Sequence, residues 1–449
     1  MFKQFSAAVI LVTCLAPVLL FAQNYTTYYT GSPFDNQTAP EGGICMMGGA
    51  SEHDEAMRWF LRRAAGGDIL VLRATGSDGY NDYLYSELGI AVNSVETIVC
   101  HNAQASEESY IHNKIRSAEA IWFAGGDQWN YVAYWRNTAI DSLINAAIVN
   151  RNIVIGGTSA GMAILGKYYF TAENGTVTSE TALSNPYDAA VTVDSAGFLD
   201  IEYMRDVITD THYADRDRQG RHTVFLARIL TDYAVAPKGI ACNEYTAVCI
   251  DTAGLATVYG DFPNYEEAAY FLQTNCELED FSPEVCLASQ PLTWNHGGQA
   301  VRVCKVYGTN NGTNTFDVSD WETTAGGEWQ NWYAVNGVLS RVVGSQIDCD
   351  GFSAGDEPSV GPDRFGLVNL YPNPFNPSTT VSFDLPYEAN VSLRTYNVQG
   401  RELAQLVDGR MPAGTHHVSW NCPECATGIY LIELITGKRR FVEKAVLLR

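Results

Sequence analysis

The chain has 449 residues, of which 46% are hydrophobic and 18% charged, a composition typical of a folded protein rather than a disordered one. This length accommodates two or three domains with sizeable cores. The formal net charge of -23 argues against a nucleic-acid-binding protein, because phosphate contacts need a basic face, and favours a cationic or neutral partner.

The N-terminus has the features of a secretory signal peptide, which we place at residues 1–22. Lys3 supplies a positive charge, and the apolar run over residues 7–21 is too short to cross a membrane comfortably. The sequence has no other long apolar segment, so we expect no integral membrane protein. Removing Cys14 with the signal peptide leaves ten of the eleven cysteines. An even number in an exported chain suggests disulfides, whose pairing the sequence leaves open.

Residues 42–256 alternate apolar strand patterns with amphipathic helical patterns. Strands separated by helices pair in parallel, so this pattern predicts an α/β layered sheet whose two faces are both covered. In such sheets, sites gather beyond the carboxyl ends of the strands. Further strand patterns, over residues 301–306 and 338–343, are expected to close the same domain, which we bound at residues 23–345.

The segment from Gly157 to Gly161 reads Gly-Thr-Ser-Ala-Gly. It follows an apolar β-branched run and precedes a helical pattern, the context of a nucleophile elbow in which a tight turn exposes one hydroxyl. Small residues on both sides of Ser159 let the strand and the helix approach closely. We therefore expect Ser159 to be a nucleophile. The alternative is an ordinary glycine-rich turn between a strand and a helix.

A serine nucleophile needs a base, and among the eight histidines His212 has the most unusual surroundings. It is followed by Arg216, Arg218 and Arg221, a pattern that combines a proton carrier with fixed cations able to clamp a carboxylate. The alternative is a solvated helix start, in which these arginines and the neighbouring aspartates are surface charges.

Residues 346–366 are rich in Gly, Ser, Asp and Pro, which predicts a linker. From residue 367 to 449 short strand patterns are separated by turns, which predicts a small all-β sandwich. Within it, Cys422 and Cys425 have the spacing of half a zinc knuckle. No second ligand pair lies nearby, so a local disulfide or free thiols are favoured over a metal site.

The elbow, the segment Gly125-Gly126-Asp127-Gln128 and the His212 region together resemble the cyanophycinase branch of peptidase family S51. The family pattern is Asp-x-His-(Phe/Tyr)-x-x-Arg-x-Arg-x-x-Arg, and residues 210–221 fill it in register. The resemblance spans roughly residues 42–343. It implies a class I glutamine-amidotransferase-like, flavodoxin-like α/β fold and serine-type hydrolysis without a metal or an organic cofactor.

The resemblance implies Ser159 as nucleophile, His212 as general base and Glu244 as the acid that orients it. Asp210 is the rival acid, because alternation along a strand would put it on the same face as His212. The backbone N–H groups of Ala160 and of Gly126, or of its neighbour Gly125, would form the oxyanion hole. The side chains expected to contact substrate are Gln128, Asp210, Arg216, Arg218 and Arg221.

The tail resembles the C-terminal sorting domains of the type IX (Por) secretion system and related FlgD-like immunoglobulin modules. The Pro-Asn-Pro-Phe-Asn-Pro segment at residues 372–377 and the Gly-Ile-Tyr at residues 428–430 carry this resemblance. It implies a secreted or surface-attached bacterial protein whose partner is the export machinery. A plain adhesive or carbohydrate-binding sandwich is the alternative.

Together, the two resemblances imply a secreted serine peptidase acting on cyanophycin, a polyaspartate with arginine on its β-carboxyls, or on a related acidic peptide. Two departures from the family pattern leave the substrate open: Thr211 replaces a common glutamine, and His222 replaces a usual leucine. The alternatives are an inactive surface-attached binding protein on the same fold, and a general dipeptidase or esterase. The oligomeric state is also open, a dimer included.

Overall fold

The computed structural model describes residues 23–195, 198–349, 366–385, 389–412, 414–436 and 439–448. The predicted signal peptide lies outside these residues. The chain divides into two compact units, Met1–Phe352 and Ser353–Arg449. None of the helices within the described ranges is long and apolar enough to cross a membrane.

The first unit contains a ten-stranded sheet with a parallel centre, in which β4, β3, β5, β6 and β2 are neighbours. Antiparallel strands extend it on both sides. In spatial order its strands are β1 (Tyr25–Gly31), β4 (Ser94–Cys100), β3 (Asp68–Arg73), β5 (Ala120–Phe123), β6 (Val154–Thr158), β2 (Ile44–Met47), β11 (Ala247–Ile250), β12 (Leu255–Tyr259), β15 (Asn314–Asp317) and β16 (Thr324–Ala325).

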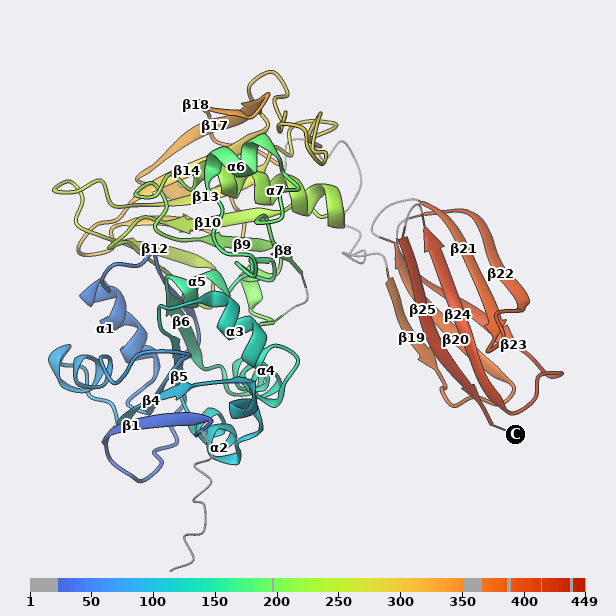
Figure 1. Ribbon diagram of the computed structural model, residues 1–449, viewed down its shortest axis with the longest axis horizontal. Coiled ribbons are helices and arrows are strands. Elements are labelled where there is room, and N and C mark those ends of the chain that lie inside the picture. Colours follow the sequence, from blue (N-terminus) through green and yellow to red (C-terminus); the bar gives the residue numbers. More distant parts are fainter. Residues whose placement is uncertain are drawn as a thin grey trace, which may run out of the picture. The chain divides into compact units, whose positions relative to one another are not determined.

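Both faces of the parallel centre are buried, as the sequence analysis predicts. Along β5, Ala120 and Trp122 belong to one apolar cluster, and Ile121 and Phe123 belong to another on the opposite face. Figure 1 shows α1 on one side of β5 and β6, with α3 and α4 on the other. The α-helices that accompany this sheet are α1 (Asp54–Arg63), α2 (Ser109–Ser117), α3 (Gln128–Trp135), α4 (Ala139–Arg151) and α5 (Ala160–Ala163).

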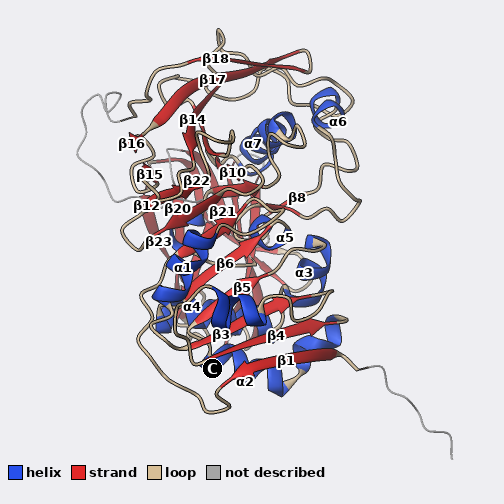
Figure 2. Cartoon of the chain, turned by 90° about the vertical axis from the view of Figure 1, so that its left-hand side faces the viewer, coloured by secondary structure: helices blue, strands red, loops and turns tan. Residues whose placement is uncertain are grey.

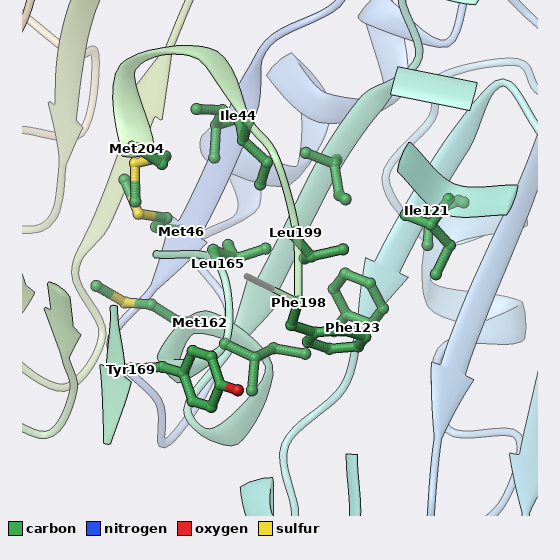
Figure 3. Packing of buried hydrophobic residues seen from close by; sticks show 14 of the residues in the cluster. Ile44, Met46, Ile121, Phe123, Met162, Leu165, Tyr169, Phe198, Leu199 and Met204 are labelled. Carbon is green, nitrogen blue, oxygen red and sulfur yellow. The ribbon is translucent and has the colours of Figure 1, made fainter. Parts of the chain in front are cut away.

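Figure 3 shows part of the largest apolar cluster of the first unit. Alternate residues of β2 and β5 contribute aliphatic, sulfur-containing and aromatic side chains to it. The labelled members are Ile44, Met46, Ile121, Phe123, Met162, Leu165, Tyr169, Phe198, Leu199 and Met204.

A six-stranded sheet forms the rest of the first unit. Its strands are β18 (Val338–Val343), β17 (Gly327–Val335), β14 (Val301–Tyr307), β13 (Ala268–Thr274), β10 (Lys238–Cys242) and β9 (Val207–Asp210). Only β9 and β10 of this sheet are parallel. The helices α7 (Gln219–Tyr233) and α6 (Ser179–Ser184) pack beside it, and a short pair, β7 (Tyr169–Phe170) with β8 (Val193–Asp194), lies nearby.

The two sheets of the first unit meet at α5. Figure 1 places this helix between β6 of the ten-stranded sheet and the β9–β10 pair of the six-stranded sheet, and Figure 2 shows it between β6 and β10. The strand ends that the sequence analysis expects to hold functional side chains therefore belong to two sheets, and they converge where the sheets meet.

The first unit extends beyond its predicted boundary at residue 345. Cys349 forms a disulfide with Cys276, and Ile347 is only 1% exposed. The backbone N–H of Cys349 also donates to Glu322. Residues 346–349, assigned to the linker from composition, are therefore bound to the first unit, and most of the remaining predicted linker lies outside the described residues.

The second unit is an antiparallel β module with two sheets around one apolar core. The first sheet contains β19 (Gly366–Tyr371), β20 (Ser378–Leu385) and β23 (Gly414–Asn421). The second contains β22 (Glu402–Met411), β21 (Ala389–Asn397), β24 (Gly428–Thr436) and β25 (Arg439–Leu447). Cys422 and Cys425, which are close in the sequence, form a disulfide. The mixed α/β layered domain and the following antiparallel β module confirm the predicted fold class.

Candidate active site

Ser159 lies at a sharp turn between β6 and α5. Its backbone has φ 51° and ψ -112°, a conformation that is costly for a residue with a side chain. The flanking glycines make the turn possible, because a Cβ on Gly157 would lie 2.5 Å from the carbonyl carbon of Gly161. A Cβ on Gly161 would lie 2.0 Å from the carbonyl oxygen of Phe123. The helix α5 therefore approaches the strands β6 and β5 this closely only with these glycines.

His212 follows β9 and faces this turn. Its Nε2 lies 2.9 Å from the Oγ of Ser159, and the residue is 7% exposed. The backbone of His212 has φ 46°, so the alternation of a strand ends before it. The strand β9 ends at Asp210, so the alternation that made Asp210 a rival acid does not extend to His212.

Glu244 follows β10, the parallel neighbour of β9, so the two strands deliver their next residues to the same edge. Its Oε1 lies 2.6 Å from the Nδ1 of His212. An ionised carboxylate can only accept a hydrogen bond, so Nδ1 holds the ring proton and Nε2 is free to accept from Ser159. The structure thus brings Ser159, His212 and Glu244 into one hydrogen-bonded chain.

The pKa values of His212 and Glu244 both lie below their ordinary values, for different reasons. Burial lowers the pKa of His212, and the nearby Arg216 and Arg218 lower it further, against the opposing effect of the hydrogen bond that His212 donates to Glu244. The hydrogen bond to His212 in turn lowers the pKa of Glu244. A neutral imidazole beside an ionised carboxylate is the state in which the ring can accept a proton.

Asp210 and Arg221 form a buried pair instead of facing a substrate. Both residues are 3% exposed, and the guanidinium donates to the two carboxylate oxygens at 2.8 and 2.5 Å. Burial alone would raise the pKa of Asp210, but the charge and hydrogen bonds of Arg221 hold it below its ordinary value. Arg221 also donates to Thr176 and to the carbonyl of Val177. In this structure Asp210 and Arg221 bind each other, and their expected contact with substrate stays a prediction.

The two remaining arginines occupy different positions. Arg216 is the exposed one, with 54% of its side chain accessible and its Nη2 3.4 Å from the Oε1 of Glu244. Arg218 donates to the carbonyl and the hydroxyl of Thr211 at 2.9 and 3.2 Å. Burial, followed by the charge of Arg221, lowers the pKa of Arg218 to about 10. Thr211, one of the departures from the family pattern, thus binds an arginine of that pattern.

The segment from Gly125 to Gln128 lies next to the serine. A Cβ on Gly125 would be 3.7 Å from the Cβ of Ser159, whereas one on Gly126 would be closest to the hydroxyl of Tyr131. Gln128 is half-buried at the first turn of α3 and donates to the carbonyl of Phe170 at 2.7 Å. Ala160, the other expected donor to an oxyanion, is 2% exposed and directly follows the serine.

Sequence reasoning missed two polar side chains that tie the His212 loop to the Glu244 loop. The carboxylate of Asp215 accepts from the backbone N–H of Glu244 at 2.8 Å. The side-chain oxygen of Asn243 accepts from the backbone N–H of Ala214 at 3.0 Å. No local motif signals either contact, because each partner comes from a distant part of the chain. His222, the other departure from the family pattern, is fully buried, and its ring nitrogens lie within hydrogen-bonding distance of the hydroxyl of Tyr213 and the carbonyl of Ile208.

A cleft of about 820 Å³ opens beside Tyr245, the residue after Glu244. The residues that line this cleft are mainly acidic: five carry carboxylates and two are arginines. Tyr259 and His53 also line it. The carboxylates are Glu52, Asp54, Glu55, Asp261 and Glu267. Within the part of the chain that the structure describes, no group of three or more His, Cys, Asp or Glu side chains could hold a metal ion.

Models of two protein families match this chain. Residues 76–258 match the model of peptidase family S51, and residues 369–448 match that of the secretion system C-terminal sorting domain. The chain thus contains an S51 peptidase domain, which acts on peptide substrates, followed by a Por-type sorting domain. The sorting domain indicates export through the type IX secretion system, to the medium or to the cell surface.

The curated relatives of the peptidase domain include cyanophycinases. The cyanophycinase of Trichormus variabilis is 22% identical over 260 residues, which cover 55% of this chain and 80% of the relative. The cyanophycinase of Synechococcus elongatus is 24% identical over 230 residues, which cover 49% of this chain and 66% of the relative.

Among solved structures, a peptidase from an acI-B1 actinobacterium is similar, with 14% identity and a TM-score of 0.37. The match covers 50% of this chain and 90% of that structure. A putative peptidase E from Listeria monocytogenes EGD-e has 16% identity and a TM-score of 0.33, covering 48% of this chain and 97% of that structure.

Proposed function

We propose that the protein is an exported serine peptidase that works through a triad of Ser159, His212 and Glu244. One observation carries the proposal: Ser159 Oγ lies 2.9 Å from His212 Nε2, while His212 Nδ1 lies 2.6 Å from Glu244. Both separations are within reach for proton transfer and for orientation of the ring. The strained backbone of Ser159 supports the same assignment.

In the proposed reaction, His212 takes the proton of Ser159 as Oγ attacks the peptide carbonyl. The oxygen of the tetrahedral intermediate accepts hydrogen bonds from the backbone N–H of Ala160 and from that of Gly126 or its neighbour Gly125. The imidazolium then protonates the departing amine, which leaves an ester on Ser159. Water, deprotonated by His212, attacks this ester, and the serine regains its proton as the acid product departs.

We propose a substrate that combines a carboxylate near the scissile bond with a cationic group beyond it, as in cyanophycin. Arg216, which is exposed beside Glu244, supports recognition of a carboxylate. The acidic cleft next to Tyr245 supports recognition of a guanidinium or an ammonium group. The cyanophycinases among the relatives motivate β-linked Asp-Arg polymers as the first substrate to test.

The triad is tested by Ser159→Ala together with labelling by a fluorophosphonate. We expect the wild-type protein to form one covalent adduct on Ser159 and the variant to form none, with unchanged thermal unfolding. Ser142→Ala, on an exposed turn of α4, is the matched control and should label normally. Peptide hydrolysis that survives in Ser159→Ala would refute the mechanism. A folded wild-type protein that never labels would favour a binding protein on the peptidase fold.

The substrate is tested by comparing cyanophycin with α-linked Asp-Arg peptides at equal concentration. We expect release of β-Asp-Arg units and little cleavage of the α-linked peptides. Equal rates on both would identify a general dipeptidase. Labelling without hydrolysis of either would retain the serine chemistry and reject this substrate class.

A further inference from the structure

The end of β2 contacts all three loops of the proposed triad through its backbone. The carbonyl oxygen of Met47 accepts from the backbone N–H of Ser159 at 3.1 Å. The next carbonyl, of Gly48, accepts from the N–H of His212 at 2.8 Å. The third, of Gly49, accepts from the N–H of Tyr245, the neighbour of Glu244, at 3.1 Å. Three consecutive carbonyls thus hold loops that are far apart in the sequence.

The position of β2 explains how one short segment reaches all three loops. It lies between the parallel strand β6, where Met47 pairs with Thr158, and the antiparallel strand β11, where Met47 pairs with Ala247. Its end therefore emerges between the residue after β6 and the loop before β11. The N–H of Gly48 donates to the carbonyl of Thr246 at 2.9 Å, which adds a second link to the Glu244 loop.

The two glycines let this backbone come close enough. A Cβ on Gly48 would lie 1.9 Å from the carbonyl oxygen of Asn243. Gly49 has φ +112°, and a Cβ there would lie 2.4 Å from Cε1 and 2.5 Å from Nε2 of His212. The bare backbone of Gly49 is therefore packed against the reacting edge of the imidazole, the edge that faces Ser159.

We propose that residues 47–49 are a positioning segment that fixes the relative placement of the nucleophile, the base and the acid loop. The inference rests on the proposed triad. It adds to the site three residues that precede the range matched by the family model, residues 76–258. Through its backbone carbonyl, each of these residues bonds to one of the three loops that carry the proposed triad. They act through His212, whose ring has no room to move toward Gly49, and through the backbone that holds each loop.

The test is Gly49→Ala, with Gly89→Ala as the matched control. Gly89 also has a positive φ, of +70°, but nothing lies within 4 Å of the position its Cβ would take. Gly89→Ala therefore places a methyl group at a positive φ without a clash, whereas Gly49→Ala also pushes on the imidazole. We expect kcat on the peptide substrate to fall on the order of 100-fold with KM unchanged, because a shift of about 1 Å in a catalytic group has such an effect. Gly89→Ala should keep the wild-type kcat.

A double-mutant cycle with His212→Ala keeps the inference testable if Gly49→Ala folds poorly. The three atoms nearest to a Cβ at position 49 all belong to the His212 ring. Gly49→Ala should therefore lower the unfolding midpoint more in the wild-type background than in the His212→Ala background, whereas Gly89→Ala should lower it equally in both. An equal drop in both backgrounds would overturn the inference. So would a kcat of Gly49→Ala within about twofold of the control, since the expected effect is on the order of 100-fold.

The cycle also separates this inference from the proposed function. The unfolding midpoints report the contact between Gly49 and His212 whether or not the protein hydrolyses peptides. A wild-type protein that neither labels with fluorophosphonate nor hydrolyses peptides would refute the proposed function. Even then, equal drops in the two backgrounds would overturn the placement of the ring by Gly49, and non-additive drops would support it.

Discussion

Two carboxylates lie near His212, and their surroundings give them different roles. Glu244 has 24% of its side chain exposed and is bound to Nδ1 of His212, whereas Asp210 is buried and bound to Arg221. A buried carboxylate that has lost its water needs its cation, so Asp210 is committed to a structural pair. At the scale of single residues, burial distinguishes the proposed acid from its rival.

This difference predicts opposite outcomes for Glu244→Gln and Asp210→Asn. The first should lower kcat by about 10³- to 10⁴-fold, because the ring loses the partner that sets its tautomer, with little change in unfolding. The second should lower the free energy of unfolding of the first unit by about 3–5 kcal/mol, because it leaves a buried guanidinium without its counter-charge. Steady-state kinetics and urea unfolding measure the two effects. A large loss of kcat in a stably folded Asp210→Asn, with Glu244→Gln active, would contradict the assignment.

The lowered pKa of His212 predicts the acid side of the pH profile. The base works only when it is neutral, and a lowered pKa keeps it neutral at lower pH, so the rate of fluorophosphonate labelling should fall at a midpoint below the ordinary value of about 6.5.

Arg216 is one of the causes of this shift, so Arg216→Gln should move the midpoint upward. Arg205→Gln, which removes an exposed arginine paired with Asp200, is the control and should leave the midpoint in place. A midpoint that moves downward in Arg216→Gln would contradict the electrostatic argument.

At the scale of elements, the site is made from the ends of strands rather than from any one motif. Ser159 follows β6, His212 follows β9 and Glu244 follows β10, while the end of β2 lies among them. Local patterns are sufficient to predict the elbow, because an apolar strand, small residues and a helix are adjacent in the sequence. They also place Asp210 on the strand β9, but the left-handed backbone of His212 breaks the expected alternation. That backbone is supported by Gly48, which is distant in the sequence.

The arginine pattern shows the same limit of local reasoning. The spacing of Arg216, Arg218 and Arg221 suggests three equivalent cations, yet only Arg216 is well exposed. Arg221 lies buried in the first turn of α7, and Arg218 donates a hydrogen bond to the carbonyl of Thr211. Which arginine is available to a ligand depends on how α7 packs against the six-stranded sheet, and the spacing along the chain does not encode that.

At the scale of the whole molecule, the peptidase domain and the sorting domain have separate cores. The apolar cluster of the second unit contains only residues of that unit, and the triad residues all belong to the first. The catalytic geometry of the first unit is therefore expected not to depend on the sorting domain, whose contribution is export.

A truncation series tests this independence and the boundary together. A chain ending at Phe352 should keep the unfolding midpoint and the rate of fluorophosphonate labelling of the first unit. A chain ending at Ser345 loses Cys349 and the buried Ile347, and its stability should fall by about 2–5 kcal/mol, as is usual when a native disulfide is removed. Cys349→Ser in the full-length chain is the control and should reproduce the disulfide part of the loss. An unstable chain ending at Phe352 would contradict the separation of the two units.

The sequence by itself determines the layered α/β class, the β module at the C-terminus, the elbow around Ser159 and the identity of the residues able to do acid–base chemistry. These features are local: they depend on periodicity, on small residues at a turn and on side-chain type. Only the tertiary structure decides that Glu244 rather than Asp210 meets the imidazole, that Arg221 is buried, and that Gly48 and Gly49 hold the loops. These contacts depend on which strand ends become neighbours and on how α7 packs against its sheet, and both are set by packing between segments that lie far apart in the chain.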